Sequence, residues 1–265
     1  MPTYRLDIEY EGTRYHGWQE QKNARSVAGE LRRAVEEAGG AVKEIGGSGR
    51  TDAGVHALAQ VAHLRLARAV DPGAFRRSVN DLLPPDIHVL GMTAVPHQFH
   101  ARHSAESRSY LYQISRRRTA FAKRWVWWVK RPLDAGRMAE AAGSLVGRHD
   151  FRLFCERPGE QPSTIVVVEG VEVVEDGALI LVRLRASHFL WKMVRRVVGT
   201  LVQVGSGELD RSSLLSLLAT KEPKGKKPAE WTAPPSGLFL ERVLYPGDAP
   251  LGPVAPVTPV SSEQW

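Results

Sequence analysis

A glycine-dense turn at residues 46–56 constrains this chain most, reading Gly-Gly-Ser-Gly-Arg-Thr-Asp-Ala-Gly-Val-His. Glycine reaches such density where the backbone needs a positive φ or where a ligand must approach the main chain closely. The turn holds Asp52, and Arg50 can pair with its carboxylate and keep it ionised. That is what a nucleophilic or general-base aspartate requires. The alternative is a purely structural turn held by an Arg–Asp ion pair.

Three common glycine-loop sites do not fit this turn. A dinucleotide-binding fingerprint needs a third glycine where Asp52 stands. A phosphate-binding Walker A loop needs a Gly-Lys-Ser/Thr ending, which is missing. Ser48 is not a hydrolase nucleophile of the Gly-x-Ser-x-Gly type, because Arg50 fills the last position.

The charge balance points to nucleic acid. The 265 residues include 36 Lys and Arg against 29 Asp and Glu, giving a formal charge of +7 and a pI near 9.7. Arginine carries most of the excess, and its planar guanidinium suits phosphates and stacked bases. The one cysteine, Cys155, is expected to be a core residue. The N-terminus has no apolar signal-like region and no run is long enough for a bilayer, so a cytoplasmic protein is expected.

Hydrophobic periodicity predicts a similar order of elements in two halves. Strands are expected at 4–10, 61–66, 87–92, 109–114, 165–174, 178–184 and 237–243. Helices are expected at 26–38, 72–82, 134–145, 189–204 and 209–219. Ser26 is a suitable N-cap for the first helix, and Asp71-Pro72 is a suitable start for the second. Asp176-Gly177 predicts a type I′ hairpin turn.

This order predicts an α+β protein of two related halves, each an antiparallel sheet with helices on one side. The N-terminal domain, which carries the Asp52 turn, is expected at 1–105 and the C-terminal domain at 106–246. Residues 247–265 are proline-rich and are expected to be a disordered tail.

Arginines interleaved with aromatic residues suggest an RNA surface. Residues 100–112 place Tyr110 and Tyr112 on one face of a strand behind several basic residues. Such surfaces stack unpaired bases and neutralise phosphates. Further basic clusters stand at 116–118, 123–124 and 221–227. Each cluster alone reads most simply as a solvated loop, but together they suit a surface that follows a nucleic-acid backbone.

The segment 188–196 predicts an amphipathic helix with Phe189, Met193 and Arg196 on one face and Trp191 with Arg195 on another. Such a helix can pack on a core while it presents an arginine to a ligand, and Arg195 is the candidate. Three histidines at 97, 100 and 103 match no common metal-site spacing, so no metal is expected.

Several motifs resemble the TruA-type tRNA pseudouridine synthases. They occur in the family's order and approximate spacing, which is more specific than any single motif. They are residues 15–19 (YHGWQ), 49–57 (GRTDAGVHA), 80–87 (NDLLPPDI), 99–102 (FHAR), 108–112 (RSYLY), 149–151 (HDF) and 189–199.

This resemblance implies isomerisation of uridine to pseudouridine at positions 38–40 of the tRNA anticodon stem-loop. It implies a pseudouridine synthase fold with a central basic cleft, a homodimer, tRNA as partner, and no cofactor or metal. The catalytic candidates are Asp52, Arg50, Tyr110 and Arg195. The candidate RNA contacts are Arg102, Arg108, Gln60, His56, Lys192 and Arg196.

Two other functions stay open from the residues alone. One is an RNA-binding protein without catalysis, in which Asp52 is replaceable. The other is a hydrolase that uses Asp52 as a general base on a phosphorylated small molecule. An RNA binder loses affinity steeply as salt rises, whereas such a hydrolase has no strong salt-dependent RNA affinity.

Overall fold

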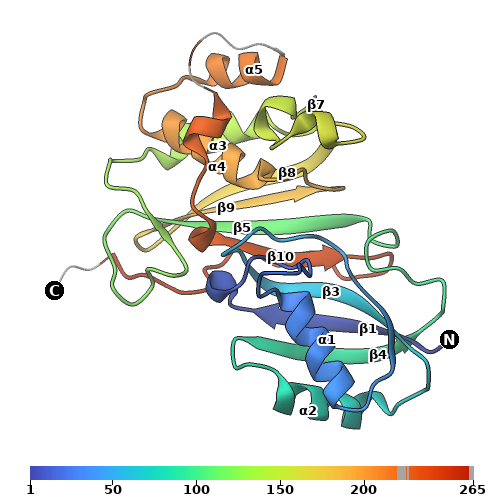
Figure 1. The fold of residues 1–265 in the computed structure, drawn as a ribbon. Helices are drawn as coiled ribbons and strands as arrows, with labels where there is room; N and C mark the ends of the chain where they lie inside the picture. Colours follow the sequence, from blue (N-terminus) through green and yellow to red (C-terminus); the bar gives the residue numbers. More distant parts are fainter. Residues whose placement is uncertain (220–224, 226, 263–265) are drawn as a thin grey trace. The chain divides into compact units, whose positions relative to one another are not determined.

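The structure of this chain is a computed structural model that describes residues 1–219, 225 and 227–262. It divides into two compact units. The first unit is Met1–Glu106 with Phe239–Asp248, and the second is Ser107–Leu238 with the residues from Ala249 onward. Each unit combines strands with helices (Figure 1), so the α+β class is confirmed. The last predicted strand belongs to the first unit from Phe239 onward, although the predicted C-terminal half extended to residue 246.

The first unit contains five strands, two helices and one 3-10 turn. These are β1 (Thr3–Tyr10), η1 (Gly12–Arg14), α1 (Val27–Glu37), β2 (Val42–Gly47), β3 (His56–Leu66), α2 (Pro72–Leu82), β4 (Ile87–Val95) and β10 (Leu238–Leu244).

The sheet of the first unit has the order β4-β1-β3-β10. β2 and β10 share one edge of β3: β10 pairs with His56 and Ala57, and β2 pairs with the stretch from Ala62 to Leu66. The β3–β10 pairing is parallel, so this sheet is not purely antiparallel as predicted. β2 itself was not expected, because its two closing glycines are typical of a loop.

α1 and α2 lie side by side on one face of this sheet (Figure 1). Both begin at the predicted caps, where the Ser26 hydroxyl accepts from the Gly29 amide and the Asp71 carboxylate accepts from the Ala74 amide. Side chains from both helices and three strands meet in an apolar core between the layers. These side chains are Leu6, Val35, Leu64, Phe75, Val79, Val89 and Met92.

The described residues of the second unit form five strands and three helices, with four 3-10 turns. These are β5 (Ser107–Ser115), β6 (Trp127–Trp128), α3 (Ala135–Gly143), β7 (Gly147–Asp150), η2 (Arg152–Phe154), η3 (Pro158–Glu160), β8 (Ile165–Asp176), β9 (Leu179–Ala186), α4 (Met193–Gly205), α5 (Arg211–Ala219), η4 (Pro228–Trp231) and η5 (Pro235–Gly237).

The sheet of the second unit has the order β5-β9-β8-β7, and β6 adds a short parallel pairing to β5. The β8–β9 hairpin turns at Gly177-Ala178, one residue later than predicted. A type I′ turn needs a positive φ at both central residues. Only Gly177, with φ 55°, has one, so the predicted turn type is wrong.

α4 begins at Met193, four residues after the predicted start. Lys192 directly precedes it in a left-handed conformation, with φ 62°. A right-handed helix cannot extend through such a residue, so α4 does not reach back to Phe189. Phe189 and Trp191 therefore do not lie on helical faces with Met193, Arg195 and Arg196. Within the helix, Gly199 allows a close approach, because a Cβ there would lie 1.6 Å from the Trp231 carbonyl oxygen.

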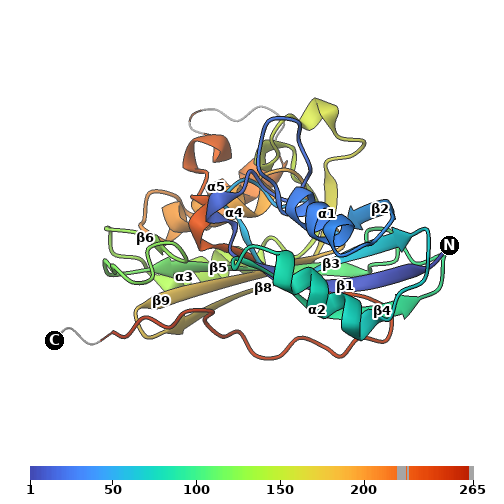
Figure 2. The same cartoon turned by 60° about the horizontal axis from the view of Figure 1, so that its bottom comes forward.

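The C-terminal segment packs on the second unit, whereas the composition predicted disorder. Val260 is buried in a cluster with Leu111, Leu179 and Leu181 from β5 and β9. The Val257 amide donates to the Gln113 side chain at 2.7 Å. Figure 2 shows this segment along the sheet face opposite α4. Its apolar side chains thus cover a face that would otherwise be open to solvent.

Within the described residues, no helix combines the length and the apolar character needed to cross a bilayer. The basic cluster 221–227 lies outside the described residues, apart from Gly225 and Lys227.

Candidate active site

The Asp52 loop, residues 48–55, joins β2 to β3 in the first unit. Its start is fixed by the body of β3. The Ser48 amide donates to the Val61 carbonyl at 2.8 Å. The fully buried Gln60 side chain donates to the Gly49 carbonyl at 2.8 Å and accepts from the Gly49 amide at 3.4 Å. Both polar atoms of this amide are therefore used to hold the loop.

Thr51, the residue before Asp52, is held from both sides. Its hydroxyl is hydrogen-bonded to the Tyr10 hydroxyl at 2.8 Å, and its carbonyl accepts from the Trp18 amide at 3.2 Å. Gly17 lies against the same carbonyl, with φ 89°, and a Cβ there would come within 2.3 Å of the oxygen. The segment 15–18 is thus a clamp on the loop, and only glycine fits at its point of closest approach.

Tyr15 extends the clamp to the far end of the loop. Its carbonyl accepts from the Gly54 amide at 3.2 Å. Its hydroxyl donates to the Asp86 carboxylate, and the Arg25 guanidinium lies 4.9 Å from its ring centroid. Burial, and then Asp86, raises the pKa of Tyr15 far above its usual value. Tyr15 therefore stays a neutral hydrogen-bond donor, which suits a positioning role.

Asp52 itself is half-buried at the centre of this loop, and its carbonyl accepts from the Val55 amide at 3.1 Å. Arg50 is exposed, and its side chain makes no ion pair or hydrogen bond with the rest of the chain that the structure describes. The predicted Arg50–Asp52 ion pair is therefore not formed. The loop geometry depends instead on main-chain contacts, and Arg50 points its charge outward.

Tyr110 and Tyr112 lie on β5 in the second unit and face the same side of the sheet, as predicted. Tyr110 is 7% exposed and meets Phe189 edge to face, with ring centroids 5.0 Å apart. Tyr112 is fully buried and donates to the Pro234 carbonyl at 2.7 Å. Burial raises the pKa of Tyr112 well above its usual range, so Tyr112 belongs to the core.

The basic residues of α4 divide into two kinds. The Arg195 side chain is half-buried, and its Nε donates to the Ala233 carbonyl at 2.7 Å. Arg196 is buried and pairs with Glu156, which also accepts from Lys192 at 3.4 Å. Arg195 thus stays a candidate for ligand contact, because its side chain is only half-buried. Arg196 and Lys192 both pair with the Glu156 carboxylate.

The other predicted RNA contacts lie in different settings. Arg102 is exposed. Arg108 is 8% exposed and donates to the Ser187 carbonyl at 2.9 Å. His56 is 1% exposed, accepts from the Gly12 amide through Nδ1 and stacks on Phe239. His56 and Gln60 are buried in this structure, and their hydrogen bonds hold the loop and its flanks.

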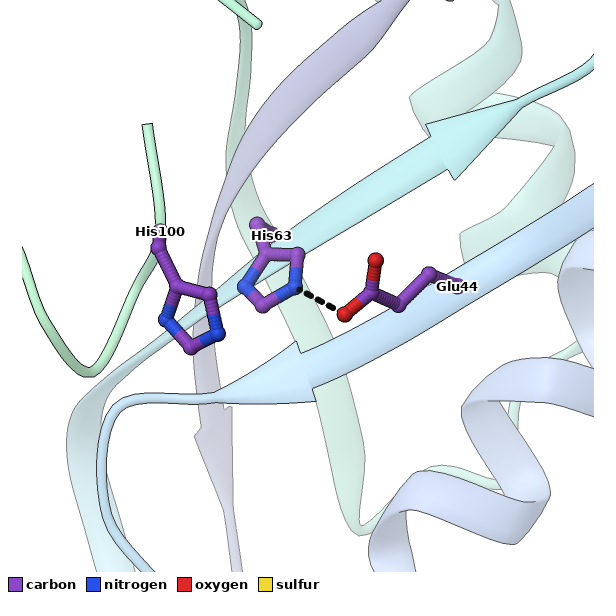
Figure 3. Close-up of side chains that lie close together, drawn as sticks. All are labelled: Glu44, His63 and His100. Carbon is purple, nitrogen blue, oxygen red and sulfur yellow. Dashed lines mark hydrogen bonds and ion pairs between the residues drawn. The ribbon is translucent and has the colours of Figure 1, made fainter. Parts of the chain in front are cut away.

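Glu44, His63 and His100 bring three possible metal ligands within 4.8 Å of one another (Figure 3). However, Nδ1 of His63 accepts from the Ala101 amide and Nδ1 of His100 accepts from the Arg102 amide, both at 3.2 Å. A neutral imidazole that accepts at Nδ1 carries its proton on Nε2. The Nε2 atoms that face the carboxylate are therefore donors, and that of His63 donates to Glu44 at 3.2 Å. This geometry favours hydrogen-bonded packing over metal ligation.

Comparison with known proteins identifies the chain. A family model described as tRNA pseudouridine synthase matches residues 8–104 and 141–246. The chain belongs to the tRNA pseudouridine synthase family. The matched ranges contain the Asp52 loop, its clamp and α4. The chain is accordingly an isomerase.

Individual relatives agree with this assignment. The tRNA pseudouridine synthase A of Rhodopseudomonas palustris (strain BisA53) is 42% identical over 92% of this chain and 100% of its own length. The protein of that name from Agrobacterium fabrum is 40% identical over 94% of this chain and 95% of its own length. Among solved structures, an archaeal box H/ACA sRNP Nop10–Cbf5 complex matches 88% of this chain and 59% of that chain, with 10% identity and a TM-score of 0.37. The last likeness is too distant to bear on the site.

Residue chemistry alone did not find the clamp. Tyr15, Gly17 and Trp18 act there through contacts with Thr51, Gly54 and Asp86, which lie far along the chain. The available signal was the YHGWQ motif at 15–19, which bears a glycine between two aromatic residues. A glycine at such a place indicates a positive φ or a close approach, and Gly17 has both.

Proposed function

We propose that this chain isomerises uridine to pseudouridine at positions 38–40 of the tRNA anticodon stem-loop, with Asp52 as the catalytic carboxylate. The observation that carries the proposal is the clamp on residues 48–55, which holds a half-buried aspartate through its neighbours' main-chain atoms. Family membership and relatives named tRNA pseudouridine synthase A support the substrate. We further propose a cytoplasmic homodimer, whose mass sedimentation analysis would measure.

The reaction breaks the N1–C1′ bond, turns the uracil and forms a C5–C1′ bond. The Asp52 carboxylate can begin it by adding to C6 of the base or by assisting glycal formation at the ribose. Either route splits one difficult step into easier ones, because a covalent or charge-paired intermediate lies between the two bonds. After C5–C1′ bond formation, the proton on C5 must leave. No atom is gained or lost overall, which is consistent with a site that needs no cofactor.

The other proposed roles follow from the settings of the side chains. Tyr110 lies beside Phe189 and is the candidate for stacking on the target uracil and taking the C5 proton. Arg195 is a proposed partner for the Asp52 carboxylate. Arg50 is exposed without an ion-pair partner among the described residues, which suits a side chain that fills the space of a displaced base. Extracting a base from its stack costs a few kcal/mol, so a filler and a stacking platform are needed.

The test is release of tritium from tRNA labelled at uridine C5, comparing the wild type with Asp52→Asn. We expect release by the wild type and none by the variant, while both bind tRNA with similar affinity. If Asp52→Asn lost tRNA affinity to the same degree as it lost turnover, the catalytic role of Asp52 would be contradicted. No release by either protein, on unmodified tRNA that is bound, would leave the alternative of a non-catalytic RNA-binding protein.

Tyr110→Phe separates stacking from proton transfer. The variant keeps the aromatic ring and loses the hydroxyl, so it should bind tRNA as the wild type does and turn over more slowly. Wild-type turnover would remove the hydroxyl of Tyr110 from the mechanism.

A further inference from the structure

We propose that residues 116–131 form a second contact surface for RNA, with Phe121 as a side chain on which an unpaired base stacks. We call these residues the basic loop. The identity of the RNA rests on the proposed function, but the surface itself is argued from the second unit alone. None of its residues is among those assigned to catalysis above.

The basic loop is extreme in composition. It holds seven basic residues, four aromatic residues and no acidic residue among sixteen. Its formal charge therefore equals the +7 of the entire chain, so the remaining residues balance to zero. A net charge gathered on one segment attracts a polyanion far more strongly than the same charge spread evenly.

The loop is anchored rather than loose. Ala122 and Val126 are buried in the cluster that also contains Val260. The Gln113 side chain donates to the Trp125 carbonyl at 2.8 Å, and Nε of Arg117 donates to a carbonyl of the C-terminal segment at 2.7 Å. These contacts fix the backbone on either side of the loop tip, so side chains there are presented in a defined place.

The tip presents aromatic surface to solvent. Phe121 is 94% exposed although it directly precedes the buried Ala122. Trp128 is 41% exposed, and the Arg118 guanidinium lies 5.9 Å from its ring centroid. Exposure of a phenyl ring to water is unfavourable in free energy, so its place on an anchored loop calls for a partner that covers it. An exposed ring at the tip of an anchored loop, with a second, guanidinium-covered ring on the same loop, offers the kind of surface on which proteins stack nucleobases.

At least three of the loop's seven cations have no carboxylate partner among the described residues. Arg116 pairs with Glu175, and Arg131 pairs with a carboxylate of the α4–α5 connection. In the part of the chain that the structure describes, Arg118, Lys123 and Lys130 have no carboxylate partner. Cations left unpaired beside an open aromatic ring are suited to phosphates that flank a stacked base.

A second copy of this chain is a poorer occupant than RNA. A two-fold interface places the same patch of both subunits against itself. Here that would bring seven cations against seven, with no acidic residue in either loop to pair them. RNA supplies the opposite charge and a planar base together. Phe121 offers no hydrogen-bonding group, so the contact should tolerate any base, as stacking platforms do.

The test compares Phe121→Ala with Phe121→Tyr and with Leu215→Ala, a matched truncation of another exposed apolar side chain in the second unit. Each protein is titrated with unmodified tRNA over a range of salt concentrations, and turnover is measured at saturating tRNA. Loss of one stacked base should weaken tRNA binding by about five- to a hundred-fold in Phe121→Ala. The tyrosine variant and Leu215→Ala should bind as the wild type does.

Further readouts separate stacking from charge. Phe121→Ala should raise KM, leave kcat unchanged and keep the wild-type dependence on salt. Lys123→Ala should instead lower the slope of log K against log salt by about 0.7–0.9.

Affinity of Phe121→Ala within twofold of the wild type would overturn the proposal. So would a change in sedimentation mass with unchanged tRNA affinity, which would make the loop a protein interface. Absence of pseudouridine formation by the wild type would contradict the proposed function alone, since binding is measured separately.

Discussion

Gly17→Ala is expected to displace the Asp52 loop while it leaves the rest of the first unit intact. The added Cβ would lie 2.3 Å from the Thr51 carbonyl oxygen, so the two segments must separate by about 1 Å to reach an ordinary contact of 3.4 Å. That movement acts on the peptide directly before Asp52. A misplacement of about 1 Å in a reacting group can lower the rate by about 10²-fold, so kcat should fall by about that factor.

Gly17→Ala lowers the free energy of unfolding for two reasons, and a second glycine of the chain allows them to be measured separately. A left-handed conformation costs an alanine about 1–2 kcal/mol, and overpacking adds about 1–3 kcal/mol. Gly39 has φ 88°, almost the same as Gly17, but a Cβ there meets nothing within 4 Å. Gly39→Ala therefore measures the backbone cost alone, and the difference between the two variants measures the clash.

The assay is thermal unfolding of both variants together with single-turnover pseudouridine formation on saturating tRNA. Gly39→Ala should lose about 1–2 kcal/mol and keep wild-type turnover. Gly17→Ala should lose about 2–5 kcal/mol and about a hundred-fold in kcat. Equal unfolding temperatures and equal turnover for the two variants would refute the clamp, because they would show that contact with Thr51 has no consequence.

Two further outcomes follow from the contacts of single residues. Gly199→Ala should destabilise the second unit by at least about 3 kcal/mol in urea unfolding, because its Cβ would lie 1.6 Å from a backbone oxygen; Gly143→Ala, which meets nothing within 4 Å, should change stability by less than about 1 kcal/mol. The pKa of Glu44 lies below its usual 4.5 because His63 and a neighbouring arginine favour the carboxylate. That group therefore adds stability above about pH 4.5 that is lost on acidification, so the unfolding-temperature gap between the wild type and Glu44→Gln should narrow below that pH. A constant gap down to pH 3 would contradict this origin.

Signals carried by neighbouring residues gave reliable predictions. The caps at Ser26 and Asp71 and the hydrophobic period behind them located α1 and α2, because capping and amphipathicity act within a few residues. The Asp52 loop itself was singled out from the density of glycines around one aspartate. The family assignment that residue motifs suggested is the one that the comparisons support.

Features that depend on distant contacts were missed. Gly46 and Gly47 are typical of a loop, yet both pair with β3 as part of β2. Glycine fits there because His63 and Trp18 occupy the space that a side chain would fill. The apolar period from Phe189 predicted helix, but the left-handed Lys192 stops α4 short of it. The proline-rich tail was predicted to be disordered because its partners on β5 and β9, such as Gln113 and Leu179, lie far earlier in the sequence.

The residues that surround Asp52 show how a carboxylate on a glycine-rich loop can be held in a defined place. A glycine-rich loop has high conformational entropy, so a carboxylate on it would sample many positions if nothing held it. The clamp removes that freedom because the Tyr15 carbonyl accepts from Gly54 and the Trp18 amide donates to Thr51. The Gln60 side-chain amide holds the start of the loop in the same way. None of these contacts uses the carboxylate itself. The main-chain hydrogen bonds of its neighbours thus hold the backbone from which the Asp52 side chain extends.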